Sequence, residues 1–354
     1  MPQPFETILI TGATGSWGNA ATQFLLDQTS ATIRCFSRDW VKQADMAERF
    51  QHNDRLRFLL GDVHDFRRLQ VAMDGVDLVF HAAALKQVTA GEYNITEVTK
   101  TNIVGTELVI RAARDMGVRK MVFLSSDKAC LPWNSYGLSK AYSERTVTQA
   151  NGYAPHKTEY CCVRYGNVHA SRGSVGELWA KALREGHPLK ITDMRMSRFF
   201  LTIQEAVCVA WSAACMAPRG GILIPHLPAY TLKDLAVALA SLHHATNVEY
   251  ETIGVRQGEK YHEDLIAPDE EARLAIYTQD GMPPLYYCVM PAAPTWEIPP
   301  IQGWSVQGRI SATNGQTQAT YGRWYRGGIE QPYNSGTWPY RLGVMDLHRR
   351  LAEE

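Results

Sequence analysis

Short apolar runs alternate with helical stretches over the first 165 residues, and this alternation limits the possible folds more than any other feature. Each strand-like run is rich in β-branched residues, and the stretch after it has apolar residues at helical spacing. Such alternation is typical of a parallel sheet covered by helices on both faces. The predicted strands are Thr7–Ile10, Thr32–Phe36, Leu56–Leu60, Val76–His81, Lys120–Ser125 and Thr158–Arg164. The predicted fold class is therefore α/β, with a doubly wound parallel sheet.

Three glycines lie between the first predicted strand and the helix that follows it. Gly12, Gly15 and Gly18 have the spacing Gly-x-x-Gly-x-x-Gly, which lets a pyrophosphate approach the free N–H groups of a helix N-terminus. A plain connecting turn is the alternative, but the position after the first strand favours a Rossmann-like dinucleotide site. The residues predicted to bind the dinucleotide here are Gly12, Thr14, Gly15, Ser16, Trp17 and Gly18.

The end of the second strand bears on which dinucleotide is bound. An NAD site would show an acidic residue here, whereas this chain has Ser37 and Arg38, with Lys42 nearby and only Asp39 as an opposing charge. Two cations and a hydroxyl suit a phosphate, so NADP is favoured over NAD. Further contacts are predicted from residues at the ends of the third and fourth strands: Asp62, Val63, Ala82, Ala83 and Ala84.

Titratable side chains are concentrated directly after the fifth predicted strand. Tyr136 and Lys140 are four residues apart on a predicted helix, so they share one face, where the ammonium favours the phenolate and orients a nucleotide. Tyr153 and Lys157 have the same spacing, but Pro155 between them blocks a regular helix. Asp127 and Lys128 are adjacent, and one can donate a proton while the other removes one. This arrangement predicts an active site for redox and elimination chemistry.

The rest of the chain predicts a second, smaller part. Beyond Tyr165 the alternation loosens, and from Pro283 to Pro339 the chain is rich in Pro, Gly, Tyr, Trp and Gln with little periodicity. Further helices are predicted at Val175–Glu185, Ile203–Met216 and Leu232–His243. The predicted organisation is an NADP-binding Rossmann domain (1–168), a smaller C-terminal substrate-binding region with segments returning to the sheet (169–285), and a loop-rich C-terminal arm (286–354).

Composition excludes several classes of function. Lys plus Arg and Asp plus Glu each number 36, so no basic excess points to nucleic acid or to an anionic membrane surface. No apolar run approaches the roughly 20 residues of a membrane span, and no secretory signal opens the chain, so we expect a cytoplasmic protein. The seven cysteines lack Cys-x-x-Cys spacing, and the histidines lack partners at ligand spacing, so no metal site is predicted.

Taken together, these motifs resemble the extended short-chain dehydrogenase/reductase family, and within it the soluble nucleotide-sugar dehydratases that invert C5. The resemblance covers about residues 5–270. The matching segments are Thr11–Gly18, Ser37–Asp39, His81–Val88, Lys100–Asn102, Ser126–Lys128, Tyr136–Lys140, Val163–Val168, Ser171–Ser174, Arg198–Phe199 and Arg256–Glu263. Thr89, Trp40 and Cys130–Trp133 depart from the family pattern and indicate an altered substrate pocket.

The resemblance implies a reaction and a role for each site residue. Tyr136 takes the C4 hydroxyl proton while hydride leaves C4 for NADP, and Lys128 then removes the C5 proton. A protonated Asp127 donates to the C6 hydroxyl, so that water leaves, hydride returns to C6, and C5 is reprotonated on the other face. Lys128 itself points to the inverting subclass, because retaining relatives have a carboxylate there. Ser126 is expected to bind sugar hydroxyls, and the residues expected to bind the rest of the substrate are Lys86, Asn167, Arg172, Arg198 and Glu263.

The function expected from this resemblance is an NADP-dependent 4,6-dehydratase acting on a UDP-linked N-acetylhexosamine, with UDP-N-acetylglucosamine favoured. A homo-oligomer, hexamer or dimer, is also expected. Three alternatives stay open: a C4 epimerase, a dehydratase that releases the unsaturated sugar, and an NADP-binding regulator without turnover. The regulator is disfavoured because it would need none of Asp127, Lys128, Tyr136 and Lys140.

Overall fold

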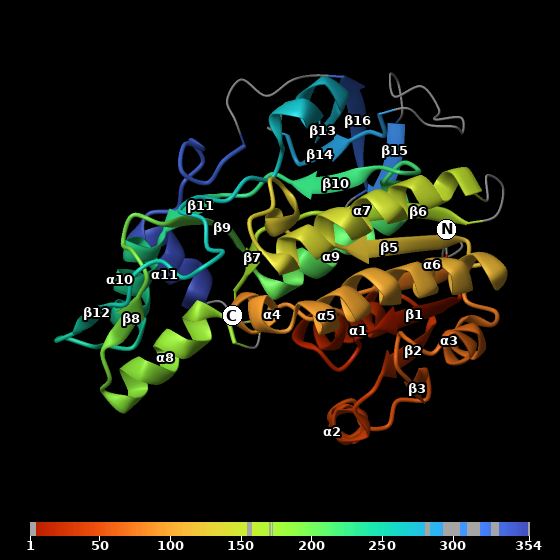
Figure 1. The fold of residues 1–354 in the computed structure, drawn as a ribbon, viewed down its shortest axis with the longest axis horizontal. Coiled ribbons are helices and arrows are strands. Elements are labelled where there is room, and N and C mark those ends of the chain that lie inside the picture. Colours follow the sequence, from red (N-terminus) through yellow and green to blue (C-terminus); the bar gives the residue numbers. More distant parts are fainter. Residues whose placement is uncertain are drawn as a thin grey trace.

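A computed structural model describes residues 5–153, 158–169, 171, 173–279, 284–292, 305–309, 319–326 and 333–352. The larger lobe is built on one sheet, which contains eleven strands among these residues (Figure 1). Its first six strands are β1 (Thr7–Thr11), β2 (Thr32–Ser37), β3 (Leu56–Leu60), β4 (Leu78–His81), β5 (Lys120–Leu124) and β6 (Glu159–Val163). They are parallel and lie in the order β3-β2-β1-β4-β5-β6, which is the doubly wound arrangement. The predicted fold class is confirmed.

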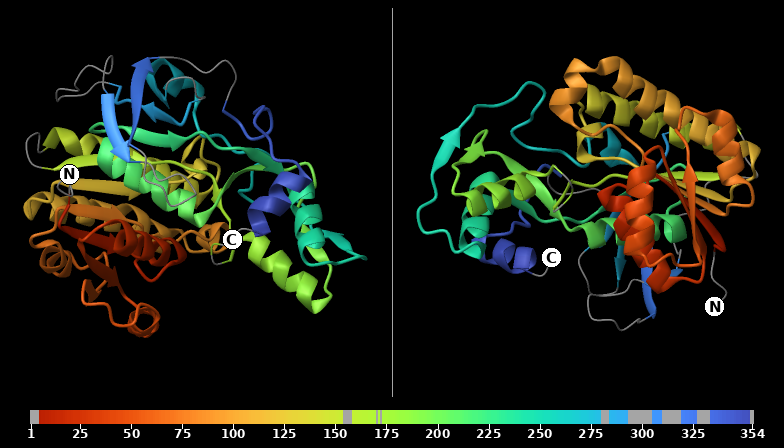
Figure 2. Two further views of the ribbon diagram at one scale, coloured as in Figure 1. Left: turned by 180° about the vertical axis from the view of Figure 1, so that it is seen from behind. Right: turned by 90° about the horizontal axis from the view of Figure 1, so that it is seen from below.

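Helices cover both faces of this sheet, as Figure 2 shows from two further sides. On one face α1 (Ser16–Gln28) packs against α9 (Ile203–Met216). On the other, α6 (Gly105–Asp115) lies between α3 (Phe66–Met73) and α7 (Ser135–Tyr153). The remaining helices of this lobe are α2 (Trp40–Arg49), which packs on β2 and β3, and the short α4 (Val88–Tyr93) and α5 (Ile95–Val98) beside α7.

The helical stretch from 95 to 115 is interrupted. Thr99–Val104 forms a π-helical segment between α5 and α6. Within it, Asn102 accepts a hydrogen bond from the Leu85 N–H at 2.8 Å and donates to the Leu85 carbonyl at 3.0 Å. Asn102 thus holds the loop after β4 from within the π-helical segment, and this contact accounts for the departure from a regular α-helix.

The smaller lobe has a core of its own. It contains a three-stranded sheet of β7 (Asn167–Val168), β9 (Ser197–Leu201) and β11 (Ala229–Thr231). A second, two-stranded sheet pairs β8 (Leu189–Ile191) with β12 (Tyr250–Thr252). The helices of this lobe are α8 (Val175–Glu185), α10 (Leu232–Leu242) and α11 (Val344–Ala352). Buried residues of this core include Trp179, Phe200, Leu235 and Leu347. The lobe lies beyond the carboxyl ends of the parallel strands, at the left of Figure 1.

The segment 286–354 differs from the expected loop-rich arm. Parallel β10 (Ile222–Pro225) is followed in the large sheet by the antiparallel strands β14 (Tyr286–Val289), β13 (Leu274–Gln279), β16 (Ala319–Arg326) and β15 (Ser305–Arg309). The described parts of 286–354 therefore supply three strands and α11. Glycine, proline and consecutive aromatic residues hide the alternation by which such strands are recognised.

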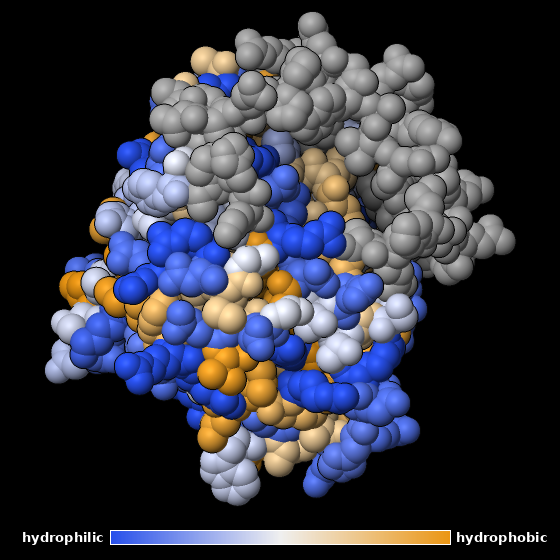
Figure 3. Space-filling model, turned by 90° about the vertical axis from the view of Figure 1, so that its right-hand side faces the viewer, coloured by the Kyte–Doolittle hydropathy of each residue, from blue (hydrophilic) through white to orange (hydrophobic). Residues whose placement is uncertain are grey.

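The surface and the helices bear on whether the described part of the chain could span a membrane. Across the described part of the face opposite the smaller lobe, hydrophilic and hydrophobic residues are interspersed (Figure 3). None of the helices in the described part of the chain combines the length and the hydropathy that a membrane span requires.

Candidate active site

A cleft of about 1490 Å³ lies between the two lobes. Its walls include the carboxyl ends of β1, β2, β4 and β5 on one side and α8 with the start of β8 on the other. All the residues predicted to bind the dinucleotide line this cleft. Ser126, Asp127, Lys128, Lys86 and Asn167 line it as well.

At one end of the cleft, the backbone at Gly12 and Gly18 leaves no room for a side chain. Gly12 has φ +71°, and a Cβ there would lie 2.9 Å from the Ala83 Cα. A Cβ on Gly18 would lie 2.3 Å from the Ala13 carbonyl oxygen. The indole N–H of Trp17, in the first turn of α1, is buried and has no protein acceptor. A bare backbone at a helix start, beside an unsatisfied donor, fits the phosphates of a dinucleotide.

The charges after β2 are already engaged with carboxylates. Arg38 lies 3.5 Å from Asp62, and Lys42 lies 2.6 Å from Asp39, in exposed pairs. Asp39 also accepts the Lys42 N–H as the N-cap of α2, and its pKa is lowered by the hydrogen bond from the Lys42 side chain. The one acidic residue that opposed a phosphate site is thus used for helix capping and is paired with a lysine.

Tyr136 and Lys140 both lie in the first turns of α7, and each has its own set of neighbours. Burial raises the pKa of Tyr136 to about 12, against the opposing influence of Lys128 and of a hydrogen bond with Ser126. Lys140 Nζ donates to the Leu124 carbonyl at 2.7 Å and lies 4.4 Å above the Phe123 ring. Burial lowers the pKa of Lys140 to about 8. The cation that acts on the Tyr136 phenol in this structure is therefore Lys128.

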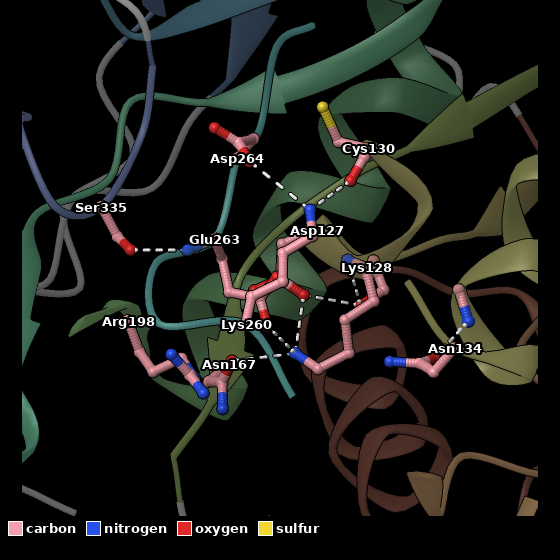
Figure 4. A network of polar contacts seen from close by, with 12 residues as sticks. Asp127, Lys128, Cys130, Asn134, Asn167, Arg198, Lys260, Glu263, Asp264 and Ser335 are labelled. Atoms are coloured by element: carbon pink, nitrogen blue, oxygen red, sulfur yellow. Dashed lines mark hydrogen bonds and ion pairs between the residues drawn. The ribbon is translucent and has the colours of Figure 1, made fainter. Parts of the chain in front are cut away.

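The adjacent pair Asp127 and Lys128 is the centre of a polar network, drawn in Figure 4. Asp127 is fully buried, and its Oδ1 accepts from Ser126 Oγ at 2.8 Å and from Lys128 Nζ at 3.0 Å. Lys128 Nζ also lies 3.2 Å from Glu263 Oε1 and 3.4 Å from Asn167 Oδ1. Burial lowers the pKa of Lys128, but the two carboxylates outweigh burial and raise it above the ordinary lysine value.

The predicted substrate-binding residues divide into three groups. Lys86, whose Nζ donates to Ser171 Oγ at 3.3 Å, and Asn167 line the cleft. Arg198 and Glu263 lie behind its wall, where Arg198 donates to the carbonyls of Ser197 and Tyr261. Arg172 lies outside the described residues.

Two parts of the site had no sequence prediction. Asn102, which holds Leu85, also donates to Ser139 Oγ at 2.9 Å and so ties α7 to the loop after β4. Lys260 Nζ donates to the Cys130 carbonyl at 2.9 Å and links the segment 258–264 to the segment 125–134 between β5 and α7. Both residues lie in segments quoted for the family resemblance, which was the available signal. The smaller lobe adds Trp179, Tyr230, Arg256 and Glu259 to the cleft wall.

Comparison with known proteins agrees with this geometry. A family model described as "Polysaccharide biosynthesis protein" matches residues 8–280. The chain is 43% identical over 268 residues to a Campylobacter jejuni protein named UDP-N-acetylglucosamine 4,6-dehydratase (inverting), covering 75% of this chain and 78% of that protein. It is 41% identical over 273 residues to a Rickettsia conorii protein named UDP-glucose 4-epimerase, covering 76% and 80%. The crystal structure of Pen from Bacillus thuringiensis superposes with a TM-score of 0.81 at 30% identity, over 99% of this chain and 98% of that one.

Proposed function

Because the chain belongs to the polysaccharide biosynthesis protein family, within the extended short-chain dehydrogenases/reductases, we propose that it is an NADP-dependent, C5-inverting UDP-N-acetylglucosamine 4,6-dehydratase. The observation that carries this proposal is the contact of Asp127 with Lys128 beside Tyr136 on one cleft wall. An acid and a base in contact can act on neighbouring carbons of one sugar.

The side chains have successive roles in this reaction. Tyr136 accepts the proton of the C4 hydroxyl, with Ser126 as its hydrogen-bond partner. NADP, held by the residues after β1 and β2, would supply the hydride chemistry at C4 and C6 when bound. The resulting ketone acidifies the C5 proton, which Lys128 removes while Asp127 protonates the departing C6 hydroxyl. Asn167 and Lys86, on the same wall, are placed to contact the sugar and its diphosphate.

The epimerase alternative has some support, since relatives with 41% identity are named UDP-glucose 4-epimerase. A C4 epimerase needs proton transfer only at the C4 hydroxyl, so a buried Asp127 in contact with Lys128 would have no task. This arrangement favours elimination over epimerisation.

The Lys128→Ala variant separates the two reactions. With UDP-N-acetylglucosamine in heavy water, we expect the wild type to form a product lighter by one water, with a new methyl signal and deuterium at C5. Lys128→Ala should lose this product by about 10² to 10⁴-fold while still oxidising C4 slowly, and Lys233→Ala, an exposed change on α10, should behave as wild type. Altered C4 stereochemistry with an intact C6 hydroxyl in the wild type would contradict the dehydratase.

The choice of NADP rests on Arg38 and Lys42. Their exposed side chains line the cleft, so each can exchange its carboxylate partner for a 2′-phosphate. We expect Arg38→Ala to weaken NADP binding about tenfold and leave NAD binding unchanged, measured by fluorescence titration. Equal losses for both dinucleotides would argue against a phosphate contact.

The proposed division of labour follows the predicted boundaries. Residues 1–168 would hold the dinucleotide and 169–285 the nucleotide sugar, since the cleft has walls from both. Cytoplasmic location and a homo-oligomer, hexamer or dimer, stay predictions of the sequence.

A further inference from the structure

The Lys128 ammonium group is completely engaged within the protein. An ammonium has three N–H donors, and three acceptors surround Nζ: Asp127 Oδ1 at 3.0 Å, Glu263 Oε1 at 3.2 Å and Asn167 Oδ1 at 3.4 Å. A base needs a free lone pair. Lys128 must therefore lose one proton before it can accept another from C5.

Glu263 is placed to hold this amine and not to bind substrate. It is 2% exposed and is not among the residues that line the cleft. Its backbone N–H donates to Ser335 Oγ at 2.9 Å, and its Oε2 is buried with no hydrogen-bond donor. Figure 4 shows its side chain directed toward Lys128 from the segment 258–264.

The segment that carries Glu263 makes two further hydrogen bonds to the segment 125–134, which contains Lys128. Lys260 Nζ donates to the Cys130 carbonyl at 2.9 Å, and Asn134 Nδ2 donates to the Gly258 carbonyl at 2.8 Å. These contacts fix where the Glu263 carboxylate stands relative to Lys128. An oxygen that orients an amine for catalysis has to be held by supporting contacts of this kind.

We propose that Glu263 is a positioning residue of the elimination step, which together with Asn167 holds two N–H groups of Lys128 and leaves the third position of its nitrogen for the lone pair. This inference rests on the proposed dehydratase function. It replaces the expectation that Glu263 contacts the substrate.

The proton balance of the step closes within the site. In the resting pair Lys128 is an ammonium and Asp127 a carboxylate, and one proton passes from Nζ to Asp127. The neutral amine keeps two N–H groups, for which Glu263 and Asn167 are the acceptors. Lys128 then takes the C5 proton, the C–H electrons form the C5–C6 double bond, and the C6–O bond breaks as Asp127 returns its proton to form water. Lys128 and Asp127 end in their starting charge states.

The test compares Glu263→Gln, Glu263→Asp and the wild type with UDP-N-acetylglucosamine. For Glu263→Gln we expect kcat to fall about 100-fold with KM changed less than about threefold. Deuterium incorporation at C5 should fall with kcat, while C4 oxidation, read from reduced nicotinamide absorbance, persists. Glu263→Asp should recover part of kcat. Glu107→Gln, an exposed change on α6, is the matched control.

Several outcomes would overturn the inference. A large rise in KM with kcat preserved would return Glu263 to substrate binding, and an unchanged kcat would show that Glu263 does not act on Lys128. If Glu263→Gln also lost C4 oxidation and thermal stability, while Glu263→Asp restored stability but not kcat, a positioning role would be excluded. Failure of the proposed function is separate, since then the wild type itself would release no water from the sugar.

Discussion

The buried guanidinium of Arg164 uses all five of its N–H donors within the protein. Arg164, directly after β6, makes paired hydrogen bonds to Glu144 at 3.0 and 2.6 Å and to Glu270 at 2.7 and 2.8 Å. It also donates to the Leu265 carbonyl. The pKa of Arg164 is raised, because the two carboxylates outweigh burial. One guanidinium thus joins α7 to the segment that leads into the strands beyond β10.

Arg164→Met should destabilise the protein strongly. Two buried carboxylates would lose their cation, which costs about 3–5 kcal/mol when one partner of a buried ion pair is removed. The free energy of unfolding from urea titration measures this loss. A change below about 1 kcal/mol would mean that solvent reaches the two glutamates.

Burial of His81 makes the free energy of unfolding depend on pH. It is fully buried at the end of β4, between the hydroxyls of Thr11 at 2.7 Å and Thr106 at 3.0 Å, and burial lowers its pKa from the ordinary 6.5 to about 3. Between these values the unfolded chain binds a proton that the folded protein does not. The free energy of unfolding therefore falls as pH drops through this window, by about 1.4 kcal/mol per pH unit.

His81→Gln should flatten this dependence. Urea titrations of the ligand-free protein at pH 7 and about pH 4 should show a smaller loss of unfolding free energy on acidification for the variant than for the wild type. His187→Gln, at a side chain 69% exposed, should keep the wild-type slope. Equal slopes for all three proteins would contradict the assignment to His81.

Among the elements, the π-helical segment Thr99–Val104 has the clearest link to the site. It allows Asn102 to hold both backbone groups of Leu85 and the Ser139 hydroxyl. Leu85 follows Ala82–Ala84 on the cleft wall, and Ser139 precedes Lys140. An irregular helix thus connects the cleft wall at 82–85 with α7, in keeping with the frequent occurrence of such segments at functional sites.

Asn102→Ala should loosen this connection. Leaving the Leu85 groups unsatisfied costs about 1–3 kcal/mol, so we expect lower stability and faster amide hydrogen exchange at 83–88. Dinucleotide affinity should fall as the wall becomes mobile. Asn94→Ala, an exposed change between α4 and α5, is the control, and unchanged exchange at 83–88 in Asn102→Ala would refute this role.

For the whole molecule, the decisive feature is that two separate cores enclose one cleft. The parallel sheet and its helices form the larger core, and α8, α10 and α11 close the smaller one. The glycine loop and the residues after β2 belong to the first, whereas Trp179 and Tyr230 reach the cleft from the second. Weakening one core should therefore affect the two ligands unequally.

Leu347→Ala tests this separation, because Leu347 is fully buried in α11 and lies away from the cleft. A cavity there should cost about 2–5 kcal/mol of stability. Calorimetric titration should show a larger loss of affinity for UDP-N-acetylglucosamine than for NADP. Equal losses would indicate that the lobes respond as one unit.

The sequence by itself determined the features that depend on neighbouring residues. Strand and helix alternation, the glycine loop and the helical spacing of Tyr136 and Lys140 are local signals, and they were sufficient for the fold class and for one cleft wall. Only the tertiary structure decided which distant groups face Lys128. Glu263 and Asn167 reach Lys128 through packing of separate elements, as Glu144 and Glu270 reach Arg164, and no local pattern encodes that proximity. The strands in 286–354 were missed for the same reason, since their pairing partners lie elsewhere in the chain.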